Sequence, residues 1–167
     1  MQGDDQRSAR LHYRRVTIDE ALALVQEPVV LPGPRAVEYP DEGTRFFALR
    51  MLERGTDDAD VFAMYHVIEG TTGALVGHIG FQGGPDQAQA VRIGYAIAGD
   101  ARHQGYAGEA LAWLLRLAAA HPGVRTIRAD TGLDNLASQR VLERAGFVLV
   151  RDDGENRFYE IPVTRPA

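Results

Sequence analysis

Two glycines at the junction between a predicted strand and a predicted helix suggest an anion site. The strand ends near Ile97, and Gly105 and Gly108 then bare the backbone where the helix begins. The first N–H groups of a helix have no partner within it, and the helix dipole favours a negative charge there. A phosphate or pyrophosphate would fit there, and the guanidinium of Arg102 could donate paired hydrogen bonds to it. Alternatively, the glycines only permit a tight turn, because the segment matches neither GxGxxG nor GxxxxGK(S/T).

A second predicted helix opens with Asn135 and carries Ser138 in its first turn. Asparagine is a preferred N-cap residue, so capping the helix is one explanation of Asn135. Ser138 is one of only two serines, with Ser8, and it lies in no GxSxG turn, so a serine hydrolase has little support. A hydroxyl that bonds back to its own helix is the alternative to a catalytic role for Ser138.

The composition excludes several other kinds of site. The 167 residues include no cysteine and no lysine, so all 18 positive charges are arginine. Disulfides, thiolate nucleophiles, thiolate metal sites, a P-loop lysine and a Schiff base are therefore ruled out. The net charge is −5 and the arginines are scattered, so we expect no nucleic-acid partner. The five histidines lack metal-binding spacing, and we expect no metal.

The elements that must position these residues follow from the spacing of apolar residues. Phe47 and Met51, for example, mark the inner side of one helix. Four helices are expected: one from Thr17 onward, one over about 44–54, one that contains Leu111 and Ala118 and ends at about 121, and one over 135–145. Strands are expected over 11–16, 60–69, 74–82, 90–98, 124–131, 147–151 and 158–163. This order predicts an α/β (α+β) fold, a mixed sheet with helices packed on it. No repeat or linker divides the chain, so we expect 1–167 to form one domain with its core over about 11–163.

Three segments of the chain carry a resemblance to a known family. They are the strand Ile93–Ile97, the loop Arg102-x-x-Gly105-x-Ala107, and Asn135-x-x-Ser138 with Gly146-Phe147 eight residues later. Together they resemble the GCN5-related N-acetyltransferase (GNAT) family, and most closely its branch of enzymes like the ribosomal-protein-alanine acetyltransferases. The resemblance implies a splayed sheet with helices on both faces, in which the strands at 90–98 and 124–131 part to admit acetyl-coenzyme A.

The resemblance also implies roles for individual residues. The pantetheine amides would pair with the strand backbone near Tyr95, Ala96 and Ile97. Asn135 would hydrogen-bond the pantetheine arm, and Ser138 would lie close to the sulfur. The pyrophosphate would rest, beside Arg102, on the backbone amides of Gln104, Gly105, Tyr106, Ala107 and Gly108.

Acetyl transfer to a primary amine needs a neutral amine, a donor to the carbonyl oxygen and a proton for the leaving thiolate. Because the chain has no cysteine, no acetyl-cysteine intermediate can form, and we expect direct transfer in a ternary complex. Ser138 is the candidate donor of the thiolate's proton, directly or through water.

The general base is where the sequence departs from the family pattern, since members often place a glutamate near the start of the strand before the phosphate loop. Arg92 stands in that neighbourhood, and arginine cannot act as a base at neutral pH. Asp130 is the preferred candidate because it lies by the expected cleft, and Glu160, His78 or a chain of waters are the alternatives. The fixed charge of Arg92 also predicts an acceptor with a negative or neutral group beside its amine, rather than a polyamine.

A chain without its base would retain a different function, that of a non-catalytic acyl-coenzyme A binding module. We expect acceptor specificity to reside in the loop 28–43, the second helix and the turn 81–89. These segments have no readable motif, so a small molecule and a peptide N-terminus both remain open. We expect a monomer or homodimer. No apolar run approaches the ~20 residues of a membrane span and the N-terminus lacks a signal-peptide core, so we expect a cytoplasmic protein with no membrane partner.

Overall fold

The computed structural model describes residues 7–55 and 60–165 of the chain. In this part of the chain, seven strands form one sheet, accompanied by four α-helices and the short 3-10 helix η1 (Gly99–Ala101). The strands are β1 (Leu11–Arg15), β2 (Met64–Glu69), β3 (Leu75–Phe81), β4 (Ala90–Ile97), β5 (Thr126–Gly132), β6 (Val148–Asp152) and β7 (Asn156–Pro162). The α-helices are α1 (Ile18–Leu24), α2 (Glu42–Arg54), α3 (Tyr106–Ala120) and α4 (Leu136–Arg144).

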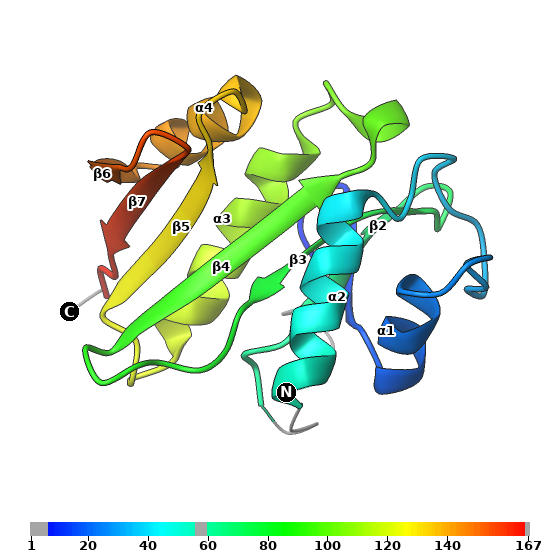
Figure 1. Ribbon diagram of the computed structural model, residues 1–167, viewed down its shortest axis with the longest axis horizontal. Coiled ribbons are helices and arrows are strands. Elements are labelled where there is room, and N and C mark those ends of the chain that lie inside the picture. Colours follow the sequence, from blue (N-terminus) through cyan, green and yellow to red (C-terminus); the bar gives the residue numbers. More distant parts are fainter. Residues whose placement is uncertain (1–6, 56–59, 166–167) are drawn as a thin grey trace.

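The sheet has the strand order β1-β2-β3-β4-β5-β7-β6. Between the described strands, β4 and β5 form the one parallel pair, and the other neighbours are antiparallel. Residues Ala90–Arg92 pair with Thr126–Arg128, and beyond them the two strands diverge toward their carboxyl ends (Figure 1). The expected mixed, splayed sheet is confirmed, and this divergence between β4 and β5 is called the fork below.

Helices cover both faces of the sheet, as expected. In Figure 1, α2 crosses the front of the sheet and α3 lies behind it, while α1 packs on α2 and α4 packs against α3 and β5. Phe47 and Met51 are buried on the inner side of α2, as their spacing predicted. On the α3 side, the rings of Tyr13 and Trp113 stack with their centroids 3.9 Å apart. Among the described helices, none is both long and apolar enough to cross a bilayer.

Short-range side-chain bonds fix where the helices begin. Thr17 and Glu20 form the capping box that their spacing predicts for α1. The second helix begins at Glu42 rather than near Thr44, because the Asp41 carboxylate accepts from Thr44 N at 2.8 Å and caps it. The start of α2 is therefore set by a capping residue that the apolar pattern does not show.

Candidate active site

The edge of β4 that faces the fork carries backbone groups without a neighbouring strand. Ala98 N donates to Val76 O at 2.8 Å, so the even-numbered residues here, Ala96 included, bond to the β3 side. In an antiparallel pair the intervening residues point the other way. Tyr95 therefore turns its N–H and C=O toward the β5 side, beyond the residues of β4 that pair with β5. Of the predicted pantetheine-binding residues, Tyr95 thus offers its peptide group to the fork, and Ala96 does not.

The N-terminus of α3 has the open backbone that an anion site needs. Gly105 is the N-cap with a left-handed φ of +79°, a conformation that favours glycine. A Cβ on Gly108 would meet no described atom within 4 Å. N–H groups at the positive end of a helix are the right donors for a pyrophosphate. The structure brings together in this loop all five residues predicted to bind it, Gln104, Gly105, Tyr106, Ala107 and Gly108.

Arg102 is turned toward other groups. Its Nε donates to Ile97 O at 3.0 Å, and its Nη2 lies 3.9 Å from Oδ2 of Asp41, the cap of α2. The guanidinium thus links the end of β4 to the start of α2. Its predicted contact with a pyrophosphate has no support from this geometry.

Arg10 also lies at this helix end, and no motif in the sequence indicates it. Its Nη1 donates to Gln104 O at 2.7 Å. Its Nη2 lies 3.4 Å from the position that a Cβ on Gly105 would occupy, and its guanidinium carbon is 5.0 Å from the Tyr106 ring centroid. Arg10 and Gln104 are 94 residues apart, so no local spacing signals their contact.

Glu109, in the first turn of α3, holds Arg10 in place. Its Oε2 accepts from Arg10 Nε at 2.8 Å, and its Oε1 accepts from Arg10 N at 2.7 Å and from Ser8 Oγ at 2.5 Å. Burial acts to raise the pKa of Glu109, but the bonds from Ser8 and Arg10 outweigh it and the pKa is lowered. The carboxylate is therefore charged at neutral pH and fastens the segment before β1 to α3.

Tyr95 and Ser138 meet between β4 and α4. The phenol oxygen of Tyr95 lies 2.9 Å from Ser138 Oγ. Burial raises the pKa of Tyr95 to about 12, so the phenol keeps its proton at neutral pH and can donate to the serine. Asn135 Oδ1 accepts from Ser138 N at 3.2 Å, which makes Asn135 the N-cap of α4. The capping explanation of Asn135 is therefore confirmed, and its contact with pantetheine stays a prediction.

Asp130, the preferred base, faces Arg92. Arg92 Nε lies 3.7 Å from Asp130 Oδ1, which is an ion-pair distance but too long for a direct hydrogen bond. The side chains are 52% and 34% exposed, so a substrate can reach both. Arg92 is among the last residues of β4 that pair with β5, and Asp130 lies two residues beyond its partner Arg128. The pair therefore stands at the fork.

The other two candidate bases are engaged elsewhere. Glu160 Oε1 accepts from Arg128 Nε at 2.8 Å. His78 is 2% exposed under α2, with its Nδ1 2.9 Å from Thr44 Oγ1. Burial lowers the pKa of His78 to about 4, so the ring is neutral at pH 7, but a substrate cannot reach it. Within residues 7–55 and 60–165, no three His, Asp or Glu side chains gather as a metal site would need.

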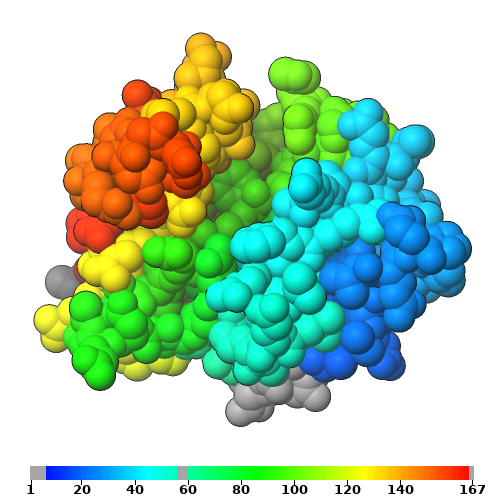
Figure 2. Space-filling model, viewed as in Figure 1, coloured from blue at the N-terminus to red at the C-terminus, as the bar shows by residue number. Residues whose placement is uncertain are grey.

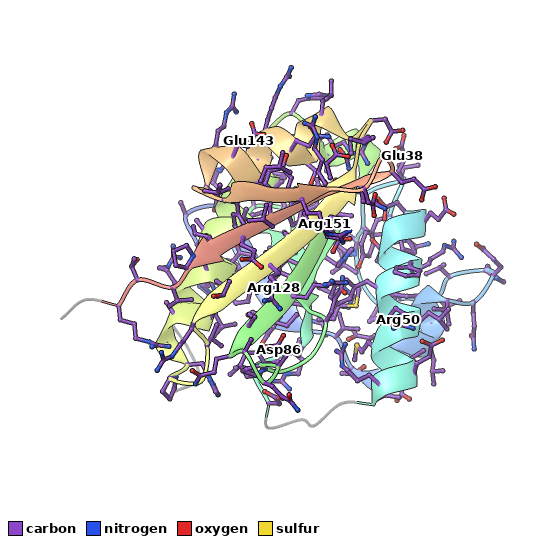
Figure 3. The ribbon with its side chains drawn as sticks, turned by 60° about the vertical axis from the view of Figure 1, so that its left-hand side comes forward. Glu38, Arg50, Asp86, Arg128, Glu143 and Arg151 are labelled. Carbon is purple, nitrogen blue, oxygen red and sulfur yellow. The ribbon has the colours of Figure 1, made fainter. Side chains whose placement is uncertain are left out.

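A hollow of about 380 Å³ opens on the α2 face of the sheet beside the fork. Figure 2 shows the surface recessed between α2, in cyan, and the yellow-to-red C-terminal strands. Figure 3 shows Arg128 and Arg151 above Asp86 along this face. The lining includes Arg92, Arg128, Asp130, Arg151, Phe158 and Glu160.

Comparisons with known sequences point to one family. The family model described as "Acetyltransferase (GNAT) domain" matches residues 10–148. A Bacillus subtilis (strain 168) protein described as "Uncharacterized N-acetyltransferase YjdG" is 36% identical over 85 residues, which are 51% of this chain and 51% of that protein. The match thus spans about half the length of this curated relative.

Solved structures share the fold over nearly the whole chain. RimL, a ribosomal L7/L12 alpha-N-protein acetyltransferase in complex with coenzyme A, has a TM-score of 0.64 at 18% identity, covering 93% of this chain and 96% of that one. A putative ribosomal-protein-serine acetyltransferase from Vibrio cholerae has a TM-score of 0.65 at 18% identity, covering 94% and 96%. The acetyltransferase from Agrobacterium tumefaciens str. C58 has a TM-score of 0.65 at 22% identity, covering 93% and 92%. At these identities the likeness establishes the fold.

Proposed function

Because this chain belongs to the GNAT family of acetyltransferases, we propose that it moves an acetyl group from acetyl-coenzyme A to a primary amine. The geometry of the fork is the observation that supports this proposal. The fork joins a strand edge with open peptide groups to a helix N-terminus just past the strand's end, and it lies beside a serine hydroxyl bonded to Tyr95. The transfer is direct, in a ternary complex, because the chain has no cysteine to carry the acetyl group.

Backbone groups and one arginine supply the cosubstrate site. The N–H and C=O of Tyr95 pair with the pantetheine amides, as an added strand would. The backbone N–H groups of Gln104 to Gly108 bind the pyrophosphate. Arg10 adds a positive charge beside Gly105, the role first expected of Arg102, because Arg10 is the arginine whose guanidinium lies there.

Ser138 and Tyr95 deliver the proton that the leaving thiolate needs. Bound acetyl-coenzyme A supplies an acetyl thioester, whose carbonyl carbon forms a bond with the amine nitrogen as the carbon–sulfur bond breaks. One proton leaves the nitrogen and one reaches the sulfur, so the products are an amide and a thiol. When Tyr95 donates to Ser138 Oγ across 2.9 Å, the serine O–H is left to point at the sulfur.

Asp130 receives the proton of the amine, directly or through water. Its carboxylate is open to the hollow and has no direct hydrogen bond to Arg92. The guanidinium beside it lowers the pKa of a nearby ammonium, because like charges disfavour the charged form. A weak base therefore suffices at this position.

A non-catalytic acyl-coenzyme A binding module is the second candidate function. Arg92 favours it, because an arginine stands where many family members place a glutamate, and arginine cannot act as a base at neutral pH. Both candidates bind the same cosubstrate through the same loop, so binding alone does not separate them.

Release of free thiol from acetyl-coenzyme A, measured with pools of amines, separates the two functions. We expect amine-dependent release by the parent and about a hundredfold slower release by Ser138→Ala, within the usual range for a lost proton donor. The affinity for coenzyme A is measured in parallel by calorimetry. Tight binding without release from any pool would overturn the transferase proposal and establish the binding module.

A further inference from the structure

The hollow beside the fork and the Tyr95–Ser138 pair lie on opposite faces of the sheet. Tyr95 bonds to Ser138 on the α4 side, whereas Arg92, three residues earlier on β4, points to the α2 side. The strands part just beyond Arg92 and Arg128, so the fork joins the two faces. An amine held in the hollow can therefore reach an acetyl group held on the other side.

The three arginines of the hollow differ in how far their charges are satisfied. Arg128 is bonded on both sides, to Glu160 at 2.8 Å and to Asp86 at 2.9 Å. Arg92 has Asp130 at 3.7 Å, beyond hydrogen-bond distance. Among the described residues, Arg92 therefore has N–H groups to offer a ligand, and Arg128 has fewer.

Arg151 is the second arginine with N–H groups to offer. Its guanidinium carbon lies over the Phe158 ring, 3.7 Å from the ring centroid, a cation–π contact that uses none of its N–H groups. The closest described carboxylate, Asp153, is 4.0 Å away. Arg151 is 59% exposed and Arg92 is 52% exposed, and both line the hollow.

The lining contains three guanidiniums and the carboxylates of Asp130 and Glu160, and Asp86 and Asp153 lie beside Arg128 and Arg151. A ligand carboxylate would bind the N–H groups that Arg92 and Arg151 do not give to a carboxylate within hydrogen-bond distance, because a guanidinium edge binds a carboxylate through paired N–H bonds. Asp130 lies two residues past the last position at which β5 pairs with β4, so its carboxylate stands at the fork and suits the amine. One ligand that carries both a carboxylate and an amine would therefore fit the arginines and Asp130 together.

We infer that the acceptor is a zwitterionic amine of the α-amino acid class, whose carboxylate is bound by Arg92 and Arg151 and whose amino group lies at Asp130. This inference rests on the proposed function and narrows its acceptor. A volume of about 380 Å³ is at the small end of ligand pockets, which suits a molecule of this size. A polyamine fits poorly, because its second ammonium would meet the arginines.

The test compares amines that differ in the carboxylate. Thiol release is measured with a pool of α-amino acids, with a pool of the corresponding amino acid amides, and with spermidine, each at equal concentration of free amine. We expect kcat/KM for the amino acids to exceed that for the amides by about tenfold or more, the usual value of a charged hydrogen-bonded pair. Spermidine should be slower still.

Variants assign the preference to the two arginines. Arg92→Gln and Arg151→Gln should each remove most of the preference for amino acids over amides, with the Kd of coenzyme A unchanged. Arg116→Gln, on the exposed side of α3, is the matched control and should keep it. Equal use of amides and amino acids by the parent, or an unchanged preference in Arg92→Gln, would overturn the inference while leaving the transferase function intact.

Binding without turnover gives an independent readout. With coenzyme A present, the parent should bind N-acetyl-leucine at least tenfold more tightly than N-acetyl-leucinamide, since only the former retains the carboxylate. Equal binding would contradict the inference even if no acceptor had yet been found. Absence of thiol release in every pool would instead defeat the proposed function.

Discussion

The phenol of Tyr95 and the hydroxyl of Ser138 lie 2.9 Å apart, joining β4 to α4 over 43 residues of sequence. The pair combines a partly buried donor whose pKa is raised to about 12 with a small hydroxyl in the first turn of a helix. In our proposal Tyr95 sets the direction of the serine proton, so the two hydroxyls act as one unit.

Removal of either hydroxyl is expected to slow turnover. Ser138→Ala should lower kcat about a hundredfold and Tyr95→Phe about tenfold, with the Kd of coenzyme A within about twofold of the parent. Tyr65→Phe is the control, because it removes a hydroxyl that donates to Val61 O elsewhere in the fold. Steady-state kinetics with calorimetry decides the question. If both variants only melted earlier, with kcat intact, the pair would be structural.

A side chain at Gly105 is expected to block the cosubstrate. Gly105→Asp places a carboxylate at the helix end, where it repels the pyrophosphate, and should weaken coenzyme A binding by about 2 kcal/mol or more. Gly73→Asp is the matched control, because Gly73 has a similar φ of +72°, against +79°, in a turn with no described atom within 4 Å of its Cβ position. Calorimetry compares the two. Equal affinities in both variants would remove the pyrophosphate site from the α3 N-terminus.

Arg10 and Arg102 are expected to differ in their effect on the nucleotide end of the cosubstrate. Arg10→Gln should raise the Kd of coenzyme A about tenfold, as loss of a charged contact does, and leave the KM of acetyl-pantetheine unchanged because that compound has no pyrophosphate. Arg102→Gln should leave both nearly unchanged. The reverse result, with Arg102 controlling the Kd, would support the assignment of Arg102 made from the sequence and contradict that of Arg10.

Asn135 can be tested for cofactor contact separately from capping. Aspartate is as good an N-cap as asparagine, so Asn135→Asp should keep the melting temperature while it loses the amide N–H groups that could bind pantetheine. Asn135→Ala loses both and should unfold about 1 kcal/mol more easily. We expect both variants to bind coenzyme A more weakly. Parent-like affinity in Asn135→Asp would leave capping as the residue's role.

Two buried histidines are expected to make the fold sensitive to acid. Burial lowers the pKa of His66 and of His78 to about 4, from an ordinary value of 6.5. Below pH 6.5 the unfolded chain therefore binds more protons at these histidines than the folded chain does. The free energy of unfolding has their full contribution above pH 6.5 and falls as the pH drops toward 4. Urea unfolding at pH 7 and pH 5 measures the loss, and His78→Gln should reduce it. A free energy of unfolding that is equal at both pH values would contradict this prediction.

Local sequence determined the parts of the site that depend on neighbours along the chain. Gly105 is the N-cap of α3 in a left-handed conformation that favours glycine, and Asn135 caps α4 because Ser138 N is three residues away. Alternating and helical apolar spacing likewise predicted the order of strands and helices. Element ends were less certain, because Asp41 caps α2 through a bond that apolar spacing does not register.

Tertiary structure alone decided which polar side chains meet. Arg10 bonds to Gln104 O, Arg102 bonds to Ile97 O, and Arg92 faces Asp130 at the fork, because a long side chain bonds to whichever partner the folded sheet brings within reach. Tyr95 finds Ser138 in the same way, 43 residues along the chain. Periodicity fixes which face of a strand a residue occupies, but strand order and register fix what stands opposite, and these arise only when the whole core packs.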